Sequence, residues 1–358
     1  MAKKTRVVVA EDSATVRKHL LEILAGDPDI EVVGEADDGK RAIELCLQAR
    51  PDVITMDMMM PVMSGLAATE YIMAHCPTPI LMVSASINRG ELFKIYEALA
   101  AGAVDVLEKP AETESADTWG RRFVAAVKLI AKIRVITHPR ARLTALHRRK
   151  PAAPRPPDGA SAARPHDLVA IGASTGGPGA VLEILRDLPR QFRLPILLVL
   201  HINEPFGSAF ADWLDAQTER PVGYARDGMP LISVAGRVAI APNDRHLVVR
   251  DGRLRLTDSP ERHFCRPSVD VLFESVAAEY GPSAAACLLT GMGRDGALGL
   301  LKIRQAGGLT IAQDEASSVV YGMPREAAIL GAATHVLGLS EIAPRLAALC
   351  GAGMETHP

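Results

Sequence analysis

Up to about residue 137, short aliphatic runs alternate with stretches whose apolar residues recur every three or four positions. The β-branched runs predict strands, and the recurring apolar positions predict amphipathic helices. A helix over Ser13–Leu24, for instance, would place Val16, Leu20 and Ile23 on one face. The predicted strands are Arg6–Ala10, Ile30–Ala36, Val53–Met56, Ile80–Ser84 and Val104–Leu107. Five strand–helix repeats indicate a doubly wound parallel sheet with helices on both faces.

A second alternating region begins at Asp167. Leu168–Ala173 and Pro195–Leu200 are continuous apolar runs typical of buried strands, and Ala180–Leu188 between them has a helical pattern. Further predicted strands are Arg237–Ala241, Ala284–Leu289 and Leu309–Ala312, with a hairpin over Leu247–Leu256 that turns at Asp251-Gly252. The second region is therefore also predicted to be α/β, larger than the first and carrying a β-hairpin.

The composition changes between these regions. From His138 to His166 the chain is rich in Arg, Pro and Ala and has no sustained hydrophobic period, which is typical of an extended linker. We therefore predict a first domain over 5–123, a final helix end and linker over 124–163, and a second domain over 164–354. The positive charge of the linker would suit an acidic partner, but charge runs of this kind usually face solvent, and we favour that interpretation.

Composition and charge exclude several classes of protein. A chain of 358 residues with 48% hydrophobic and 23% charged residues is expected to form two globular domains with ample cores. A net charge of −2 gives no general attraction to nucleic acid, and the longest apolar run of the second half, Pro195–Leu200, is far too short to insert in a membrane. Five scattered cysteines without Cys-x-x-Cys spacing indicate reduced thiols, so we expect a cytoplasmic protein.

Carboxylates follow two of the strands predicted in the first domain. Glu11 and Asp12 come directly after one strand, and Asp57 follows another. Acids gathered at strand ends repel one another unless a hard cation lies between them. Mg²⁺ would relieve that repulsion and attract a phosphate, so the pattern predicts that Asp57 accepts a phosphoryl group. The charge gained there would change whatever follows in the chain.

Two further residues complete this candidate site. Ser84 ends the fourth predicted strand and Lys109 follows the fifth, where a hydroxyl and a cation can contact phosphoryl oxygens. With these residues the first third of the chain resembles the receiver domain of two-component response regulators, which is a flavodoxin-like fold.

The resemblance to receivers implies specific roles. Asp57 would be phosphorylated by a histidine kinase, and Asp12, Asp57 and the Met59 carbonyl would bind Mg²⁺ with help from Glu11. Ser84 and Lys109 would sense the phosphate. Val106 stands where such domains usually carry an aromatic switch residue, so signalling through an aromatic rotamer is not expected.

The second domain begins with a serine turn. Gly172-Ala173-Ser174-Thr175-Gly176 follows a strand and fits G-x-S-x-G, a turn that lifts a serine above a sheet. A serine nucleophile needs a base, and His201 ends the next predicted strand. Asp295 follows another buried strand and would orient the imidazole. Ser174, His201 and Asp295 are therefore the predicted catalytic residues.

Other interpretations of these residues remain open at this point. A glycine-rich turn after a strand also occurs in phosphate-binding loops, but Gly172–Gly177 lacks the lysine of a P-loop and an acid suitably placed for ribose. His246 and His263 would compete as bases, although neither ends the strand next to the serine turn.

The order Ser174, His201, Asp295 differs from the serine, acid, histidine order of α/β-hydrolases. The order and the flanking residues instead resemble the catalytic domain of chemotaxis protein-glutamate methylesterases, which is a Rossmann-like sheet. The segment Arg262-His263-Phe264-Cys265-Arg266-Pro267-Ser268-Val269-Asp270 adds to this resemblance. It implies that the backbone N–H groups of Thr175 and Met292 form an oxyanion hole. Arg266 is either structural or pairs with a substrate carboxylate.

The two resemblances together predict a phosphorylation-activated serine hydrolase. It would demethylate glutamate esters on the cytoplasmic helices of chemoreceptors, releasing methanol, and would deamidate selected receptor glutamines. The ester reaction would need no cofactor, and the unphosphorylated receiver would restrain the second domain. The alternatives are a response regulator whose output domain binds DNA and one whose output domain is non-catalytic. A DNA-binding output needs a compact helical motif with a basic face, which the alternating pattern disfavours.

Overall fold

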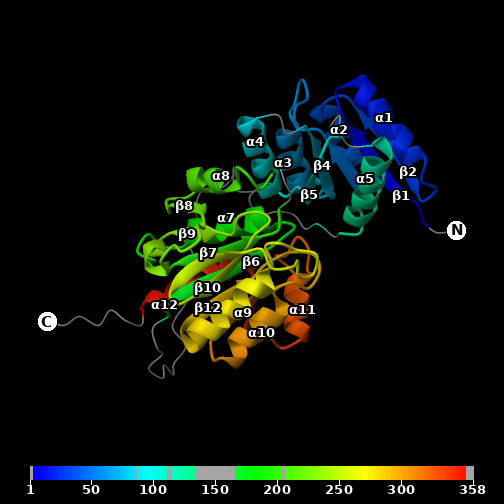
Figure 1. The fold of residues 1–358 in the computed structure, drawn as a ribbon. Helices are drawn as coiled ribbons and strands as arrows, with labels where there is room; N and C mark the ends of the chain where they lie inside the picture. Colours follow the sequence, from blue (N-terminus) through cyan, green and yellow to red (C-terminus); the bar gives the residue numbers. More distant parts are fainter. Residues whose placement is uncertain are drawn as a thin grey trace. The chain divides into compact units, whose positions relative to one another are not determined.

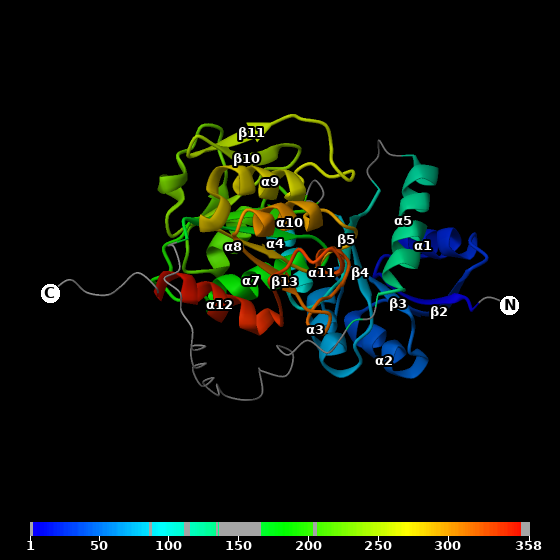
Figure 2. The same cartoon turned by 90° about the horizontal axis from the view of Figure 1, so that it is seen from below.

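The structure is a computed structural model that describes residues 3–85, 88–110, 115–133, 135, 166–202 and 206–351. The chain divides into two compact units, Met1–Leu146 and His147–Pro358 (Figures 1 and 2). Most of the predicted linker over 124–163 lies outside the described residues, as do the last positions of the predicted second domain. No helix within the described residues combines the length and the apolar character that crossing a bilayer requires.

The first unit is a five-stranded parallel sheet in the order β2-β1-β3-β4-β5. Its strands are β1 (Thr5–Ala10), β2 (Ile30–Ala36), β3 (Val53–Met56), β4 (Ile80–Ser84) and β5 (Asp105–Glu108). Its helices are α1 (Ala14–Ala25), α2 (Gly39–Ala49), α3 (Gly65–His75), α4 (Arg89–Ala100) and α5 (Ala116–Ile130). Helices α1 and α5 pack together on one face, and α3 packs with α2 and α4 on the other (Figure 2).

Polar caps fix the starts of the helices in this unit. Ser13, Asp38 and Ser64 each accept a hydrogen bond from a backbone N–H in the first turn of the helix that follows. The chain passes from β1 outward to β2 and then returns to β3 on the other side of β1. Strand order therefore reverses between β1 and β3, and ligands of such sheets bind beyond the strand ends at that point.

The second unit is a seven-stranded sheet in the order β14-β13-β12-β6-β7-β9-β8, and all of its strand pairs are parallel. Its strands are β6 (Leu168–Ala173), β7 (Ile196–Leu200), β8 (Val222–Tyr224), β9 (Val238–Ile240), β12 (Ala284–Leu288), β13 (Leu309–Gln313) and β14 (His335–Leu337). Strand order reverses on either side of β6, because the chain moves from β6 to β7 and later returns to β12. This places a second binding crevice above the carboxyl ends of β6, β7 and β12.

Helices cover both faces of the second sheet. Helices α9 (Val269–Tyr280) and α10 (Ala297–Gln305) pack together, and α11 (Met323–Ile329) packs beside α10. Helices α7 (Gly177–Asp187) and α12 (Leu339–Gly351) pack together on the opposite face (Figure 2). Helix α8 (Phe210–Gln217) lies against β8. The buried core between these layers is mainly aliphatic and includes Phe273 of α9.

The predicted fold class of both domains is confirmed. The predicted hairpin is present as β10 (His246–Arg250) and β11 (Arg253–Thr257), which form a separate two-stranded antiparallel sheet. It turns at Asp251 and Gly252, both with positive φ. Strands β8 and β14 were not predicted, because each has only three residues and, unlike the buried strand β9, lies in no continuous apolar run.

Candidate active site and phosphoacceptor site

The acidic residues of the first unit meet at the reversal point between β1 and β3. Glu11 and Asp12 follow β1, and the Asp57 N–H donates to the Ala10 carbonyl oxygen at 2.9 Å. Carboxylate oxygens of Glu11, Asp12 and Asp57 all lie within 4.8 Å of one another. Lys109 reaches the cluster from the loop after β5, with its Nζ 2.8 Å from Glu11 Oε2 and 3.1 Å from Asp57 Oδ1.

The electrostatics of this cluster favour a bound cation. Burial, followed by repulsion from a neighbouring acid, raises the pKa of Glu11 and of Asp57, although Lys109 opposes the shift. Burial acts against the charged form of Lys109, but its contacts with Glu11 and Asp57 outweigh burial and raise its pKa. Three clustered carboxylates with one ammonium group are short of positive charge, and oxygen ligands are those that Mg²⁺ prefers. The residues present therefore fit a hard divalent cation.

The other predicted residues of this site have defined positions. Ser84 is buried at the end of β4, and its carbonyl oxygen accepts from the Lys109 N–H at 3.0 Å, so Ser84 and Lys109 lie side by side. The Met59 side chain is exposed and its sulfur lies 3.5 Å from Lys94 Nζ. Val106 is half-buried in β5, opposite Met82 of β4.

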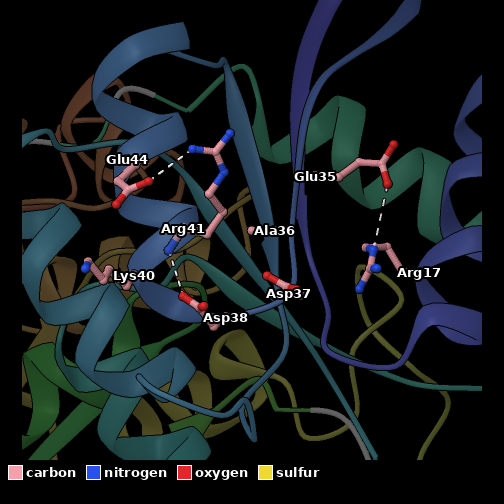
Figure 3. A pocket seen from close by; sticks show the side chains of 8 residues that line it. All are labelled: Arg17, Glu35, Ala36, Asp37, Asp38, Lys40, Arg41 and Glu44. Atoms are coloured by element: carbon pink, nitrogen blue, oxygen red, sulfur yellow. Dashed lines mark hydrogen bonds and ion pairs between the residues drawn. The ribbon is translucent and has the colours of Figure 1, made fainter.

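A charged pocket of about 420 Å³ lies between α1, β2 and α2 (Figure 3). Arg17 faces Glu35 at 3.7 Å and also donates to the Glu11 carbonyl oxygen at 2.6 Å. Arg41 and Glu44 pair at 3.0 Å, and Asp38 caps α2 by accepting from the Arg41 N–H. The charges of this pocket largely pair with one another, so we assign it no ligand.

Ser174 stands in the turn between β6 and α7. Its N–H donates to the Thr290 carbonyl oxygen at 3.0 Å, and the next helix is entered through Gly176, whose φ of +77° suits glycine. Gly291 lets the segment after β12 approach the serine closely, because a Cβ at Gly291 would lie 2.7 Å from the Ser174 Cβ. The local sequence thus brings the ends of β6 and β12 together around Ser174.

His201 lies beside the serine turn because β7 pairs with β6. Ala173 is opposite Leu200 in the parallel register, and the His201 N–H donates to the Ala173 carbonyl oxygen at 3.0 Å. The imidazole Nε2 lies 3.0 Å from Asp295 Oδ2. Since an ionised carboxylate only accepts hydrogen bonds, Nε2 carries the proton, and Nδ1 is the acceptor nitrogen of the neutral ring. The three predicted catalytic residues therefore come from adjacent strand ends, and two of them are in direct contact.

Asp295 is held by the start of helix α9. It is almost fully buried, and the helix-capping residue Ser268 donates its hydroxyl to Asp295 Oδ1 at 2.7 Å. The N–H groups of Val269, Asp270 and Gly296 also donate to this carboxylate, at 2.7, 3.1 and 3.1 Å. Although burial opposes ionisation, His201 and these donors lower the pKa of Asp295. Asp295 is therefore a fixed anion beside the imidazole.

Sequence analysis named Ser268 only as part of the Arg262–Asp270 segment and gave it no role, although its position before the Val269-Asp270 start of α9 is a typical capping signal. It also gave no role to Cys265, whose sulfur lies 3.8 Å from His201 Nδ1. The signal for Ser268 was available in the sequence. No local pattern would have placed Cys265 against the imidazole, because its loop has no periodicity.

The two predicted oxyanion donors lie on segments that are tied together. The Thr290 hydroxyl donates to the Thr175 carbonyl oxygen at 2.9 Å and accepts from the Val320 N–H at 2.9 Å. The N–H groups of Thr175 and Met292 have no acceptor among the described residues. Both N–H groups are available to donate to the oxyanion of acyl transfer, and their role in an oxyanion hole stays a prediction.

Three other residues considered from the sequence are engaged elsewhere. Both ring nitrogens of His246 are occupied, by the Ser268 N–H at 3.1 Å and the Pro260 carbonyl oxygen at 3.2 Å. His263 contacts Asp270 Oδ2 at 3.1 Å. Arg266 pairs with the Asp244 carboxylate at 2.8 and 2.5 Å, and its predicted role toward substrate stays a prediction.

The His201 environment predicts the pH dependence of ester hydrolysis. Burial disfavours the imidazolium, but hydrogen bonds with Asp295 and Cys265 outweigh it and raise the pKa of His201 to about 9. A base acts only in its neutral form, so log kcat/KM for a small glutamyl methyl ester should rise with a slope of about one up to that pKa. A pH–rate profile of the wild type, corrected with the rate of Ser174→Ala, tests this. A flat profile between pH 6 and 9 would contradict it.

The two folds and their sites define a response regulator whose output domain is a hydrolase. Residues 7–117 match the family of response regulator receiver domains, and residues 169–346 match the CheB methylesterase family. The chain belongs to the family of protein-glutamate methylesterases/protein-glutamine glutaminases, in which a receiver domain precedes a CheB methylesterase domain.

Relatives of this family match nearly the whole chain. A protein-glutamate methylesterase/protein-glutamine glutaminase of Anaeromyxobacter dehalogenans is 45% identical over 337 residues, covering 94% of each chain. One of Nitrosospira multiformis is 42% identical over 358 residues, covering 98% of each. The Thermotoga maritima CheB methylesterase catalytic domain is 37% identical, covers 51% of this chain and 98% of its own, and has a TM-score of 0.49.

Proposed function

We propose that this chain hydrolyses glutamate methyl esters on chemoreceptors, releasing methanol, and deamidates specific receptor glutamines to glutamate. Relatives with this activity in their names match 94% or more of the chain, and family membership supplies the substrate. The observation that supports the mechanism is the contact between His201 Nε2 and Asp295 Oδ2 at 3.0 Å, one strand away from Ser174. The proposed activity needs a catalytic output domain, so it stands against the two alternatives, an output domain that binds DNA and one that is non-catalytic.

In the proposed acylation step, His201 Nδ1 removes the proton from the Ser174 hydroxyl, because Nε2 is committed to Asp295. The serine oxygen attacks the ester carbonyl, and the N–H groups of Thr175 and Met292 donate to the oxyanion that forms. Asp295 stabilises the imidazolium and does not itself take the proton. The imidazolium then protonates the leaving methoxide, and methanol departs.

In the second step, water attacks the glutamyl ester of Ser174 with His201 again acting as base. Collapse of the tetrahedral intermediate releases the serine and leaves a free glutamate on the receptor. The same residues can deamidate glutamine, because protonation of the leaving nitrogen by the imidazolium releases ammonia. No part of either reaction requires a metal ion or an organic cofactor.

The first domain supplies the regulation. We infer that a histidine kinase donates a phosphoryl group to Asp57, with Mg²⁺ held by Glu11, Asp12, Asp57 and the Met59 carbonyl. The bound ion would neutralise the charge of the incoming phosphate. Lys109 and Ser84 lie next to Asp57 on neighbouring strand ends and would contact the phosphoryl oxygens. A protein that acts on cytoplasmic receptor helices would work in the cytoplasm.

Phosphorylation of Asp57 is expected to raise the rate of methanol release from methylated receptor. With acetyl phosphate and Mg²⁺, the wild type should gain between about 5- and 150-fold, the usual range of coupling between two sites. Asp57→Asn should keep its basal rate and lose the gain, because an amide cannot form the acyl phosphate. The measurement is methanol released per minute, with and without acetyl phosphate. Stimulation of Asp57→Asn equal to that of the wild type would exclude Asp57 as the acceptor.

A further inference from the structure

Phe264 is the most exposed large apolar side chain of the described residues, with 97% of its surface accessible. It lines a pocket of about 430 Å³ that is also lined by His201, Asp295 and Met292. Leaving an aromatic ring in water has no stabilising effect on the fold, and exposed apolar side chains beside a pocket are typical of binding sites. The position of Phe264 therefore needs an explanation other than packing.

The backbone under Phe264 adopts a conformation that its sequence does not favour. The Arg262 N–H donates to the Cys265 carbonyl oxygen at 3.1 Å, and the Cys265 N–H donates back to the Arg262 carbonyl oxygen at 2.9 Å. The two residues between them, His263 and Phe264, have φ values of +53° and +62°. Two left-handed central residues are the pattern of a type I′ turn, for which Asn-Gly is the favoured pair. Histidine and phenylalanine are strained there.

The other three residues of this turn are fixed to the domain. His263 Nε2 donates to Asp270 Oδ2 at 3.1 Å, and Asp270 is fully buried at the start of α9. Arg262 pairs with Glu274 of the same helix at 2.6 Å. The Cys265 sulfur lies 3.8 Å from His201 Nδ1. The turn is therefore anchored on both sides, and Phe264 is its only residue in the exposed class.

We propose that Phe264 is a docking residue for the receptor helix, packing on an apolar side chain about one or two helical turns from the methylated glutamate. On a helix, residues three, four and seven positions apart lie on one face. A glutamyl ester directed toward His201 thus brings such a neighbour to the rim of the same pocket, where Phe264 and the exposed Met292 lie. A turn whose backbone is already ordered loses little conformational entropy on binding.

This inference rests on the proposed function, since it names the part of the substrate that Phe264 recognises. The inference predicts that changes at Phe264 affect a receptor substrate and a small ester differently. A receptor segment uses both the catalytic residues and the Phe264 ring, whereas a small glutamyl methyl ester brings no neighbouring helical side chain to pack on the ring. The ring should therefore affect KM for the receptor and leave the chemical step, measured by kcat, unchanged.

The experiment compares Phe264→Ala, Phe264→Leu and the wild type in the full-length chain. With methylated receptor fragment as substrate, Phe264→Ala should raise KM by about tenfold or more, the usual loss when an aromatic hot-spot residue of an interface is truncated, with kcat unchanged. Phe264→Leu should restore much of the affinity. With N-acetylglutamate methyl ester, all three proteins should have the same kcat/KM.

Ile232→Ala is the matched control, because Ile232 exposes 80% of its surface and lies on the 3₁₀ turn Leu231–Val234, outside this pocket. An equal rise in KM for Ile232→Ala would overturn the inference, as would an unchanged KM for Phe264→Ala. A similar loss of kcat/KM for Phe264→Ala on the small ester would show that Phe264 shapes the active site, and this result would also overturn the inference. A wild type that hydrolyses the small ester but no receptor ester would reject the proposed function itself.

Discussion

Replacing Ser174 with alanine should reduce the hydrolysis of methylated receptor by about 10⁴-fold or more, because the covalent step loses its nucleophile. The remaining rate would come from binding and from the oxyanion donors alone. The Ser174 hydroxyl has no hydrogen bond to any described residue, so its removal should leave the melting temperature unchanged. The measurements are methanol release and thermal unfolding of both proteins.

Ser233→Ala is a suitable control for this substitution. Ser233 is exposed on the second domain, and its hydroxyl contacts only the Pro230 carbonyl oxygen among the described residues. Its loss should leave the rate of hydrolysis unchanged. A fluorophosphonate probe should label the wild type and Ser233→Ala but not Ser174→Ala. If Ser174→Ala kept a tenth of the wild-type rate, another residue would be the nucleophile.

The sequence was sufficient to predict which candidate site residues lie together at strand ends. Parallel strands end at one edge of a sheet, so Asp12 after β1 and Asp57 after β3 had to come close once those strands were adjacent. The same reasoning placed His201 beside Ser174, because two buried runs joined by a helix form neighbouring parallel strands. Short runs of four to six mainly apolar residues are strong enough signals for such predictions.

The contacts contributed by the loop between β11 and α9 could not be predicted in this way. Cys265 reaches His201 and Phe264 reaches the pocket through a turn that has no period and an unusual backbone conformation. Its shape depends on His263 meeting Asp270 and on Arg262 meeting Glu274, which are tertiary contacts. The imidazole orientation is also a tertiary property, since it follows from where Asp295 lies. The positions of strand ends can thus be predicted from the sequence, but the orientation of the side chains around them cannot.

Replacing Asp295 with asparagine should reduce kcat by about 10³- to 10⁴-fold, although the side chain keeps its size. The carboxylate accepts five hydrogen bonds, from His201, from the Ser268 hydroxyl and from three backbone N–H groups. An amide has one acceptor oxygen, so its NH₂ group must face some of these donors. If it faces the imidazole, His201 Nε2 becomes the acceptor, and the proton moves to Nδ1, which can then no longer accept the serine proton.

Two measurements separate this positioning role from a general loss of structure. The unfolding free energy of Asp295→Asn should fall by about 1–3 kcal/mol, the usual effect of leaving a buried donor unsatisfied, so the protein should remain folded at 25 °C. The pKa of His201 should fall in the variant, because the anion that stabilises the imidazolium is gone. The residual rate should therefore level off at a lower pH than in the wild type.

Ser268→Ala is the control for this substitution. It removes one hydrogen-bond donor to Asp295 and keeps the anion, so its rate should fall by no more than about tenfold. If Asp295→Asn had the wild-type pH profile and a rate within tenfold of the wild type, the imidazole would not depend on Asp295 for its proton position.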